Sequence, residues 1–415
     1  MRNPNFLWII VGIMLVLEIY VFQAIKMVMP VSQPRLRLTI FVIYWFLSVL
    51  MLGTLIALPY LNYESWPKQL RTYVFALIVG AFFSMVITSL FLAVDDIRRG
   101  ATWIIVKIFR NPELDTATPS EGITRSAFLT WLGLGLGGGL FTTLVYGFSN
   151  KYNYTTKRLN LAYNNLPDAF KGLKIVHISD IHCGSFMDKK AVQHGIDTIL
   201  KEKPDLILFT GDLVNDRASE MVEYMDVFNQ LKAPMGVYST LGNHDYGDYA
   251  LWPSREEKTA NLERLKSVHS ELGWKLLMNE NVVFEKNNQQ LALIGIENWS
   301  AKSNFPKYGM MSEAYPGTEK IPFKILLSHD PSHWDAEVRT KYNDIDLMLA
   351  GHTHGMQFGV EIPGFKWSPV QYMYKQWAGL YEEGNQKLYI NRGFGFIGYP
   401  GRVGILPEIT VITLT

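Results

Sequence analysis

The sequence predicts a multi-pass α-helical membrane region followed by an α/β domain in which two packed mixed β-sheets are flanked by helices. Two observations predict this division. Long apolar runs dominate the first 150 residues, whereas strand-like and helix-like patterns alternate from residue 159 to the end of the chain. We therefore expect a membrane region over residues 1–148, a polar tether over 149–158 and a globular domain over 159–415.

Four segments are long and apolar enough to cross a bilayer, which takes roughly 20 residues. They cover about 6–28, 38–60, 72–94 and 127–146. Buried helices of a soluble core are the alternative, but nothing between the first three segments could form the polar half of a soluble domain. Glu18 lies within the first segment and is expected to face the other helices, and both a functional and a purely structural role stay open for it.

The fourth segment contains the glycine-rich run 132–139, which should pack closely against another helix because small residues let backbones approach. A phosphate-binding loop is disfavoured, since no strand precedes the glycines and no Lys-Ser or Lys-Thr pair follows them. Between the third and fourth segments, residues 97–109 mix apolar and basic side chains at helical spacing. Such a helix could lie flat on the inner leaflet.

The distribution of Lys and Arg predicts the orientation in what we take to be a bacterial cell membrane. The loops after the first and third segments carry seven such residues, against three on the other side. This bias places both termini and the globular domain outside the cytoplasm, although Lys151, Lys157 and Arg158 weaken it. The formal net charge of +1 gives no indication of a nucleic-acid partner, and the sequence does not indicate an oligomeric state.

Strands and helices of the globular domain follow from apolar runs and their spacing. Nine strands are predicted, over 174–179, 205–210, 237–240, 282–285, 291–296, 324–328, 346–350, 388–391 and 409–414. Three helices are predicted, over 189–201, 218–231 and 256–272. The early alternation of strand and helix indicates parallel strands, and the later run of strands indicates a second, more antiparallel sheet.

Five polar clusters each follow an apolar strand. The first is Asp180-x-His182, whose two side chains can converge because residues i and i+2 of an extended strand face the same side. The others are Gly211-Asp212, Gly242-Asn243-His244-Asp245, Ser328-His329-Asp330 and Gly351-His352-Thr353-His354. Polar residues at such strand ends form the sites of α/β sheets. For one histidine in one turn a structural role would be the simpler interpretation, but five clusters in series indicate a site.

The donor set suits a pair of divalent ions. Imidazole nitrogens, carboxylates and an amide oxygen form a mixed N/O site that fits Mn, Fe or Zn, and there are more donors than one tetrahedral ion needs. Two ions about 3.5–4 Å apart can activate a bridging water and bind two phosphoryl oxygens. The sequence therefore predicts hydrolysis of a phosphate ester or pyrophosphate by a metal-activated hydroxide.

Together these motifs resemble the calcineurin-like metallophosphoesterase family, above all its membrane-attached bacterial branch. Part of the run 170–182 and the segment Asn391-Arg-Gly-Phe-Gly395 add to that likeness. Some members of the branch cleave the pyrophosphate of UDP-diacylglucosamine. The resemblance implies a phosphate-containing small molecule or lipid as substrate. It also implies a first ion held by Asp180, His182 and His354, a bridging Asp212, and a second ion held by Asn243, His329 and His352.

The resemblance further implies that His244 binds no metal but protonates the leaving group or stabilises its charge. Asp245 could orient His244 or cap a turn. Many relatives have Asp where this chain has Asn215, so the pairing of His244 stays open. The alternative function is a catalytically silent membrane scaffold or binding protein with the same fold, which the presence of all eight expected residues disfavours.

Several other residues are assigned with less support from the sequence. Cys183 is expected to be structural, and so is His177, whereas His194 and His269 are expected at the surface or its boundary. Three further residues are considered as contacts of the pocket or the substrate, namely His333, Arg392 and Arg402. The aromatic run 367–374 with Trp377 could contact lipid or pack against the second sheet.

Overall fold

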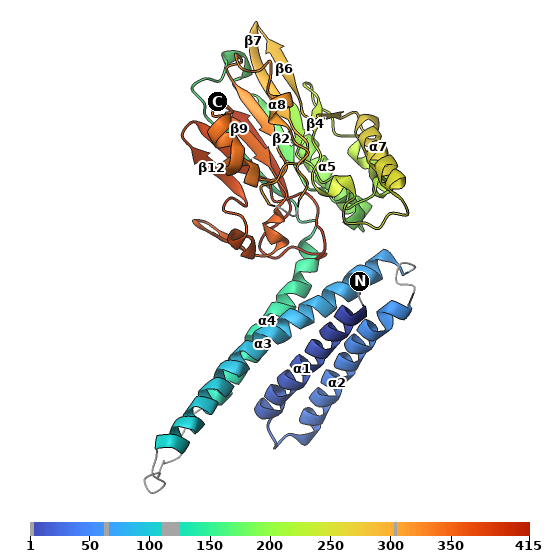
Figure 1. Cartoon of the computed structure of the whole chain (residues 1–415), viewed down its shortest axis with the longest axis vertical. Coiled ribbons are helices and arrows are strands. Elements are labelled where there is room, and N and C mark those ends of the chain that lie inside the picture. The colour runs from blue at the N-terminus through green and yellow to red at the C-terminus, as the bar shows by residue number, and fades with distance from the viewer. Residues whose placement is uncertain (1–3, 62–65, 110–124, 303–304) are drawn as a thin grey trace. The chain divides into compact units, whose positions relative to one another are not determined.

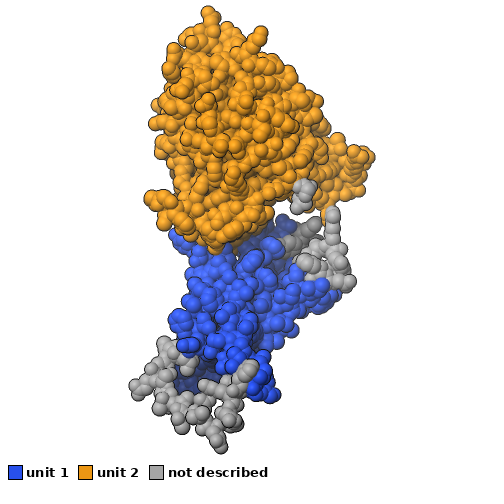
Figure 2. All heavy atoms as spheres, turned by 60° about the vertical axis from the view of Figure 1, so that its left-hand side comes forward, with its two compact units in different colours: residues 1–146 blue, residues 147–415 orange. Residues whose placement is uncertain are grey.

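The computed structural model describes residues 4–61, 66–109, 125–302 and 305–415. The chain forms two compact units, Met1–Tyr146 and Gly147–Thr415 (Figure 2). Unit 1 contains four long helices (Figure 1): α1 (Pro4–Val28), α2 (Pro34–Ala57), α3 (Lys68–Phe109) and α4 (Arg125–Gly147). All four are long and apolar enough to cross a membrane, as the sequence predicts.

Helix α3 differs from the prediction because it runs unbroken for 42 residues through the stretch 97–109. No proline interrupts this stretch, and Arg98 Nη2 pairs with Asp95 Oδ1 at 2.8 Å across one helical turn. Ser126, near the start of α4, also donates a hydrogen bond to Asp95. The stretch expected to lie flat as a separate helix therefore continues α3, which spans about 63 Å at 1.5 Å per residue.

Helices α3 and α4 pack closely at the glycine-rich run, which confirms that prediction. Ser84 Oγ donates to the backbone oxygen of Gly137 at 2.7 Å, and Thr88 Oγ1 lies 3.1 Å from that of Gly133. A methyl group on Gly137 would collide with Thr88 and Ser84, whereas one on Gly138 would meet nothing within 4 Å. Only the glycines on the α3 side of α4 are therefore required for packing.

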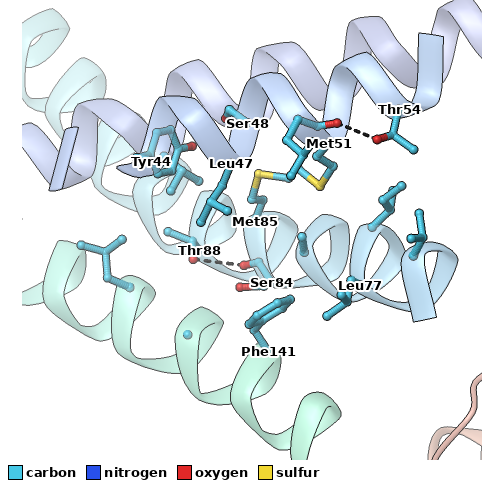
Figure 3. Close-up of a pocket in the computed structure, with 17 residues that line it drawn as sticks. Tyr44, Leu47, Ser48, Met51, Thr54, Leu77, Ser84, Met85, Thr88 and Phe141 are labelled. Atoms are coloured by element: carbon cyan, nitrogen blue, oxygen red, sulfur yellow. Dashed lines mark hydrogen bonds between the residues drawn. The ribbon is translucent and has the colours of Figure 1, made fainter. Parts of the chain in front are cut away.

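An apolar cavity of about 550 Å³ lies within unit 1 (Figure 3). Its walls come from all four helices, and its hydroxyl groups are mostly bonded to nearby backbone: Thr54 Oγ1 donates to Leu50 O and Thr88 Oγ1 to Ser84 O. Tyr44, also in the wall, donates to the backbone oxygen of Glu18 at 2.7 Å. The Glu18 side chain is fully buried, as expected, and its carboxyl oxygens make no hydrogen bond within the described part of the chain.

Unit 2 contains two six-stranded sheets and one separate hairpin. The first sheet has the order β1 (Thr155–Leu161), β14 (Glu408–Leu414), β2 (Lys174–Ile178), β3 (Leu206–Phe209), β4 (Val237–Ser239) and β5 (Lys275–Leu276). The second has the order β12 (Gly379–Glu383), β13 (Gln386–Ile390), β9 (Leu347–Ala350), β8 (Lys324–Leu327), β7 (Gln289–Gly295) and β6 (Glu280–Lys286). The hairpin pairs β10 (Val360–Ile362) with β11 (Phe365–Trp367).

Alternation along the buried strands builds a layered core. In β2 and β3, Ile175 and Leu208 belong to the cluster shared with the second sheet, whereas Val176 and Phe209 pack on the helix side. That side is covered by α5 (Lys189–Lys201) and α7 (Arg255–Glu271), which match the predicted helices within one residue. Because both faces are buried, these strands are apolar at nearly every position.

All nine predicted strands are present, and five others were missed: β1, β5, β10, β11 and β12. Strand β1 includes residues 155–158 of the expected tether. The sequence did not reveal this strand because its partner, β14, lies at the other end of the chain. The second sheet is more antiparallel than the first only at its two edges, where β12 pairs with β13 and β6 with β7. The predicted helix 218–231 is a 3₁₀ turn, Ala218–Tyr224, followed by α6 (Met225–Phe228).

The packing of α4 on α3 yields a first prediction. Gly137→Ala should destabilise unit 1 by about 1–3 kcal/mol, because the added methyl group must displace Thr88 or the α3 backbone. Gly138→Ala is the matched control and should leave stability unchanged or slightly higher. Thermal unfolding of the full chain in detergent, followed by far-UV circular dichroism, measures both. Equal midpoints for the two variants would contradict this packing.

Candidate metal centre

The predicted site residues follow the carboxyl ends of strands in both sheets. Asp180 and His182 follow β2, Asp212 follows β3, and Asn243 and His244 follow β4. His329 follows β8 of the second sheet, and His352 and His354 follow β9. Two contacts join the sheets at this edge: His352 N donates to the Asp180 carboxylate at 3.0 Å, and His329 Nδ1 lies 2.7 Å from Thr210 O.

Six of these residues form two compact groups. In the first, donor atoms of Asp180, His182 and His354 all lie within 4.8 Å of one another. Donor atoms of Asp212, His329 and His352 form the second group by the same measure. Each group brings one carboxylate and two imidazoles together, a combination suited to a divalent transition metal.

Asn243 and Asp212 complete the arrangement. Asn243 Oδ1 lies 2.8 Å from His352 Nδ1, which is itself 3.3 Å from His329 Nε2, so an amide oxygen joins the second group. Asp212 Oδ2 lies 3.2 Å from His329 Nε2 and 3.5 Å from His182 Nε2. Its carboxylate thus faces donors of both groups, the position that a bridging ligand requires.

The backbone is strained where the donors lie. Positive φ angles between 48° and 70° occur at five of the six grouped residues, with His329 the exception. Such angles are uncommon for residues other than glycine and persist when the surroundings impose them. Gly351 lets the turn after β9 approach the turn after β2, since a Cβ atom at Gly351 would collide with Ser179 and Asp180. These turns aim successive side chains back at the same point.

Several ring nitrogens in the groups are buried without a hydrogen bond. Among the residues that the structure describes, both nitrogens of His182 and Nε2 of His354 have no hydrogen-bond partner, although His354 Nε2 lies 3.3 Å from Asp180 Oδ1. Leaving buried polar atoms unpaired is costly, so a ligand for them is expected. The donor set and these unpaired nitrogens both fit divalent metal ions.

Hydrogen bonds at one ring nitrogen orient His329 and His352 toward their donor group. His329 is placed to donate from Nδ1 to Thr210 O, and His352 from Nε2 to Tyr374 Oη at 2.8 Å. Each ring then keeps its second nitrogen available toward the group, as metal-ligating histidines do. Tyr374 in turn donates to Asp330 Oδ2 at 3.3 Å.

The electrostatics of the second group are dominated by Asp212 and His329. Burial disfavours ionisation of Asp212, but the His329 and His244 imidazoles outweigh it and lower the pKa of this carboxyl well below its usual value. Burial likewise disfavours protonation of His329, yet the Asp212 charge prevails and raises its pKa to about 10. A cation at this position therefore satisfies the carboxylate, and a divalent ion would replace the proton.

His244 lies beside the groups without joining them. Its ring is 4.9 Å from that of His182, between centroids, and its Nδ1 is 2.8 Å from the backbone oxygen of Asn215. The pairing of His244 that the sequence left open is thus made with a backbone carbonyl. Donation from Nδ1 to Asn215 leaves Nε2 as the nitrogen that can carry a proton to a substrate.

Asp245 acts on the backbone rather than on His244. Its carboxylate accepts hydrogen bonds from Asp212 N, Leu213 N and Gly242 N at 2.8–2.9 Å, and from Val214 N at 3.3 Å. Burial and the nearby Asp212 charge raise the pKa of Asp245 to about 7. Of the two roles left open by the sequence, the structure has the turn-capping one.

The structure separates the remaining candidates from the groups. His333 Nδ1 lies 3.0 Å from Ser328 Oγ, and its Nε2 lies 3.2 Å from Glu337. Arg392 pairs with Glu408 and Glu361. Cys183 Sγ donates to a backbone oxygen at 3.4 Å and His177 contacts Thr210 Oγ1, in line with structural roles. His269, expected near the surface, is instead fully buried against Ser239.

Three residues near the site were missed or misjudged from the sequence. Arg402, considered as a substrate contact, is fully buried and donates to the backbone oxygen of Arg392 at 2.7 Å, while its Nη2 lies 3.2 Å from His354 Nδ1. Tyr374 contacts His352, and Tyr249 Oη accepts from Asn243 Nδ2 at 2.9 Å. Tyr374 lies in the aromatic run 367–374, the only sequence feature that indicated it.

Two family models match the chain. The model described as "Probable Calcineurin-like phosphoesterase, transmembrane domain" matches residues 1–151. The model described as "Calcineurin-like phosphoesterase" matches residues 173–356, which contain every residue of the two donor groups. The two matches follow each other along the chain without overlap.

Curated relatives match the region that contains the donor groups. The uncharacterized metallophosphoesterase YkuE of Bacillus subtilis is 31% identical over 257 residues, which cover 60% of this chain and 81% of that protein. Phosphodiesterase YaeI of Escherichia coli is 30% identical over 58% of this chain and 82% of its own length. A Danio rerio transmembrane protein with metallophosphoesterase domain is 29% identical over 62% of this chain, but the match spans only 56% of that relative.

The Asp245 contacts yield a second prediction. Asp245→Asn should lower stability by about 1–3 kcal/mol and reduce the metal content, because an amide nitrogen cannot accept the backbone hydrogen bonds that hold the Asp212 and Gly242 turns together. Asp248→Asn is the control, since Asp248 forms only a partly exposed ion pair with Lys258. Thermal unfolding and metal analysis of the full chain test this. Wild-type behaviour of Asp245→Asn in both assays would show that the turns do not depend on it.

Proposed function

The chain belongs to the calcineurin-like metallophosphoesterase family, and from this premise we propose that it hydrolyses a phosphodiester or pyrophosphate at a centre of two divalent ions in unit 2. The membership makes it a metal-dependent phosphoester hydrolase. The observation that carries the rest is the convergence of two donor groups on the shared carboxylate of Asp212. Seven N and O donors in that arrangement exceed what a single ion needs.

We assign the donors as follows. Asp180, His182 and His354 would hold one ion, Asn243, His329 and His352 the other, and Asp212 both. When bound, Mn, Fe or Zn ions at these positions supply Lewis acidity that activates water and stabilises charge on phosphoryl oxygens. The strained turns, together with the hydrogen bonds that His352 and His329 donate to Tyr374 and Thr210, hold the donors in position before any ligand arrives.

His244 would serve the leaving group. Its Nδ1 is held by the Asn215 carbonyl, so the proton available for transfer is the one on Nε2. Because all eight expected residues are present and assembled, a catalytically silent scaffold is disfavoured.

The third prediction separates metal binding from proton transfer. Asp212→Asn and His352→Ala should each lose bound metal, and their rate of bis(p-nitrophenyl) phosphate hydrolysis should fall by more than about 100-fold. The loss should be this large because mutating even residues that only contact metal ligands typically lowers metal affinity or activity by about 10–100-fold. His244→Gln should keep its metal and lower kcat by about 10²–10⁴-fold. Metal analysis and steady-state kinetics, with chelation and Mn²⁺ restoration of the wild type, distinguish the two. Full activity in Asp212→Asn would overturn the mechanism.

We also propose that unit 2 lies outside the cytoplasm, on the strength of the Lys and Arg bias of the loops. The fourth prediction is that a cysteine-reactive, membrane-impermeant reagent labels a cysteine added after Thr415 in intact cells. The native Cys183 is buried and should not react. Labelling only after the cells are lysed would show that unit 2 lies in the cytoplasm, where it would meet cytoplasmic substrates.

A further inference from the structure

The hairpin β10–β11 carries its apolar side chains on the outside. The chain reverses at Pro363-Gly364, where Gly364 has a φ of 78°. Val360 pairs with Trp367 and Ile362 with Phe365, so these four side chains share one face. Glu361 pairs with Lys366 on the opposite face. A sheet in a soluble protein normally turns its apolar face to the core and its polar face to water.

The charged face is the one that contacts the body of unit 2. Glu361 Oε1 lies 2.9 Å from Arg392 Nη2 and 3.2 Å from Lys157 Nζ. Lys366 donates to the backbone oxygen of Ala378 and, at 3.1 Å, to Tyr381 Oη. These ion pairs and hydrogen bonds hold the charged face against unit 2, so the apolar face of the folded hairpin points away from it.

The turn after the hairpin adds two exposed apolar side chains, and Tyr372 Oη of this turn lies 3.5 Å from Trp367 Nε1 of the apolar face. Ile362 and Phe365 are 57% and 54% exposed, Val360 is also exposed, and Tyr372 and Met373 are 78% and 58% exposed. We call these five residues the apolar rim. Tyr374 and Trp377 of the same aromatic run are buried, so the run is divided between packing and exposure. A cluster of large exposed apolar side chains marks an interaction site.

The base of the hairpin is bonded to the point where the chain leaves α4. Gly359, which precedes β10, donates to Val403 O at 2.9 Å, and the neighbouring Arg402 N donates to Gly147 O at 2.9 Å. Asn150 Nδ2 also lies 3.3 Å from Arg402 O. The fourth candidate membrane span ends at Asn150. The segment that emerges from the bilayer is therefore bonded directly to the loop that holds the hairpin.

The rim is also connected to the donor groups through short contacts. Tyr374, next to Met373 of the rim, contacts His352. Ser368, which follows β11, donates from Oγ to the backbone oxygen of Gly355 at 2.8 Å, and Gly355 follows His354. Residues 352–374 thus connect the second and first donor groups to the rim within one short stretch of chain.

We propose that the apolar rim inserts into the interfacial layer of the bilayer, and that the centre beside it acts on phosphate esters of membrane lipids. The bilayer is the occupant because the hairpin base is bonded to the end of a membrane span. Tyr372 suits the headgroup level, and the exposed Lys375 suits anionic headgroups. The statement about substrate rests on the proposed function, whereas the insertion does not.

Fluorescence labelling of the full chain tests the insertion. Cys183 is buried, so Ile362→Cys can carry a single environment-sensitive fluorophore, with Val283→Cys on the edge strand β6 as the exposed apolar control. In phosphatidylcholine–phosphatidylglycerol vesicles, nitroxide-labelled acyl chains should quench the fluorophore at 362 at least twofold and leave that at 283 unchanged. Equal quenching at the two positions would overturn insertion. Protection of 362 from aqueous iodide without quenching by lipid would also overturn it, and would indicate a protein partner.

Two substrates with the same leaving group test the consequence for catalysis. The variant Ile362→Asp/Phe365→Asp should hydrolyse bis(p-nitrophenyl) phosphate within twofold of wild type. Its hydrolysis of phosphatidyl-p-nitrophenol in vesicles should fall at least tenfold. Equal rates of wild type and variant on the lipid ester would overturn the lipid-substrate inference. If the metal-loaded wild type hydrolyses neither compound, the proposed function fails, while the labelling experiment still decides insertion by itself.

Discussion

The candidate metal centre depends on turns that the isolated chain would not favour. Asp180, His182, Asp212, His352 and His354 all have left-handed backbone conformations, each of which is costly for a residue with a side chain. Hydrogen bonds from the surroundings impose these conformations. Asp245 binds four backbone N–H groups of two turns, and the Asp180 carboxylate accepts the N–H of His352 from the other sheet. Site and sheet edge are therefore stabilised by the same contacts.

Most polar residues around the donors form hydrogen bonds or ion pairs with other residues of unit 2. Arg402 binds backbone oxygens, Arg392 pairs with Glu408 and Glu361, and Tyr374 joins His352 to Asp330. Arginines in such a glycine-rich segment suggest phosphate binding when only the sequence is considered. In the fold, burial decides otherwise, because a buried guanidinium must be paired within the protein. The network that results fixes both the donor groups and the hairpin β10–β11.

That network also includes the hairpin β10–β11 and residues 147–150. Arg392 and Lys157 hold Glu361 and thereby turn the apolar face of the hairpin outward, while the loop 399–403 bonds the hairpin base to residues 147–150. Residues 147–150, the hairpin and the donor groups are thus joined by short bonded segments within unit 2. This continuity within unit 2 is what supports the proposed action on a substrate that stays in the bilayer.

The sequence by itself determined the four apolar helices, the nine main strands and the donor residues, because each depends on local pattern: length of an apolar run, or polar residues after a buried strand. It did not reveal β1, which pairs with the far end of the chain, or the continuous α3. Only the tertiary structure showed that the Asp212 carboxylate faces both groups, decided between the two roles considered for Asp245, buried Arg402 and turned the hairpin face outward. These features depend on contacts between residues tens to hundreds of positions apart, which no local pattern encodes.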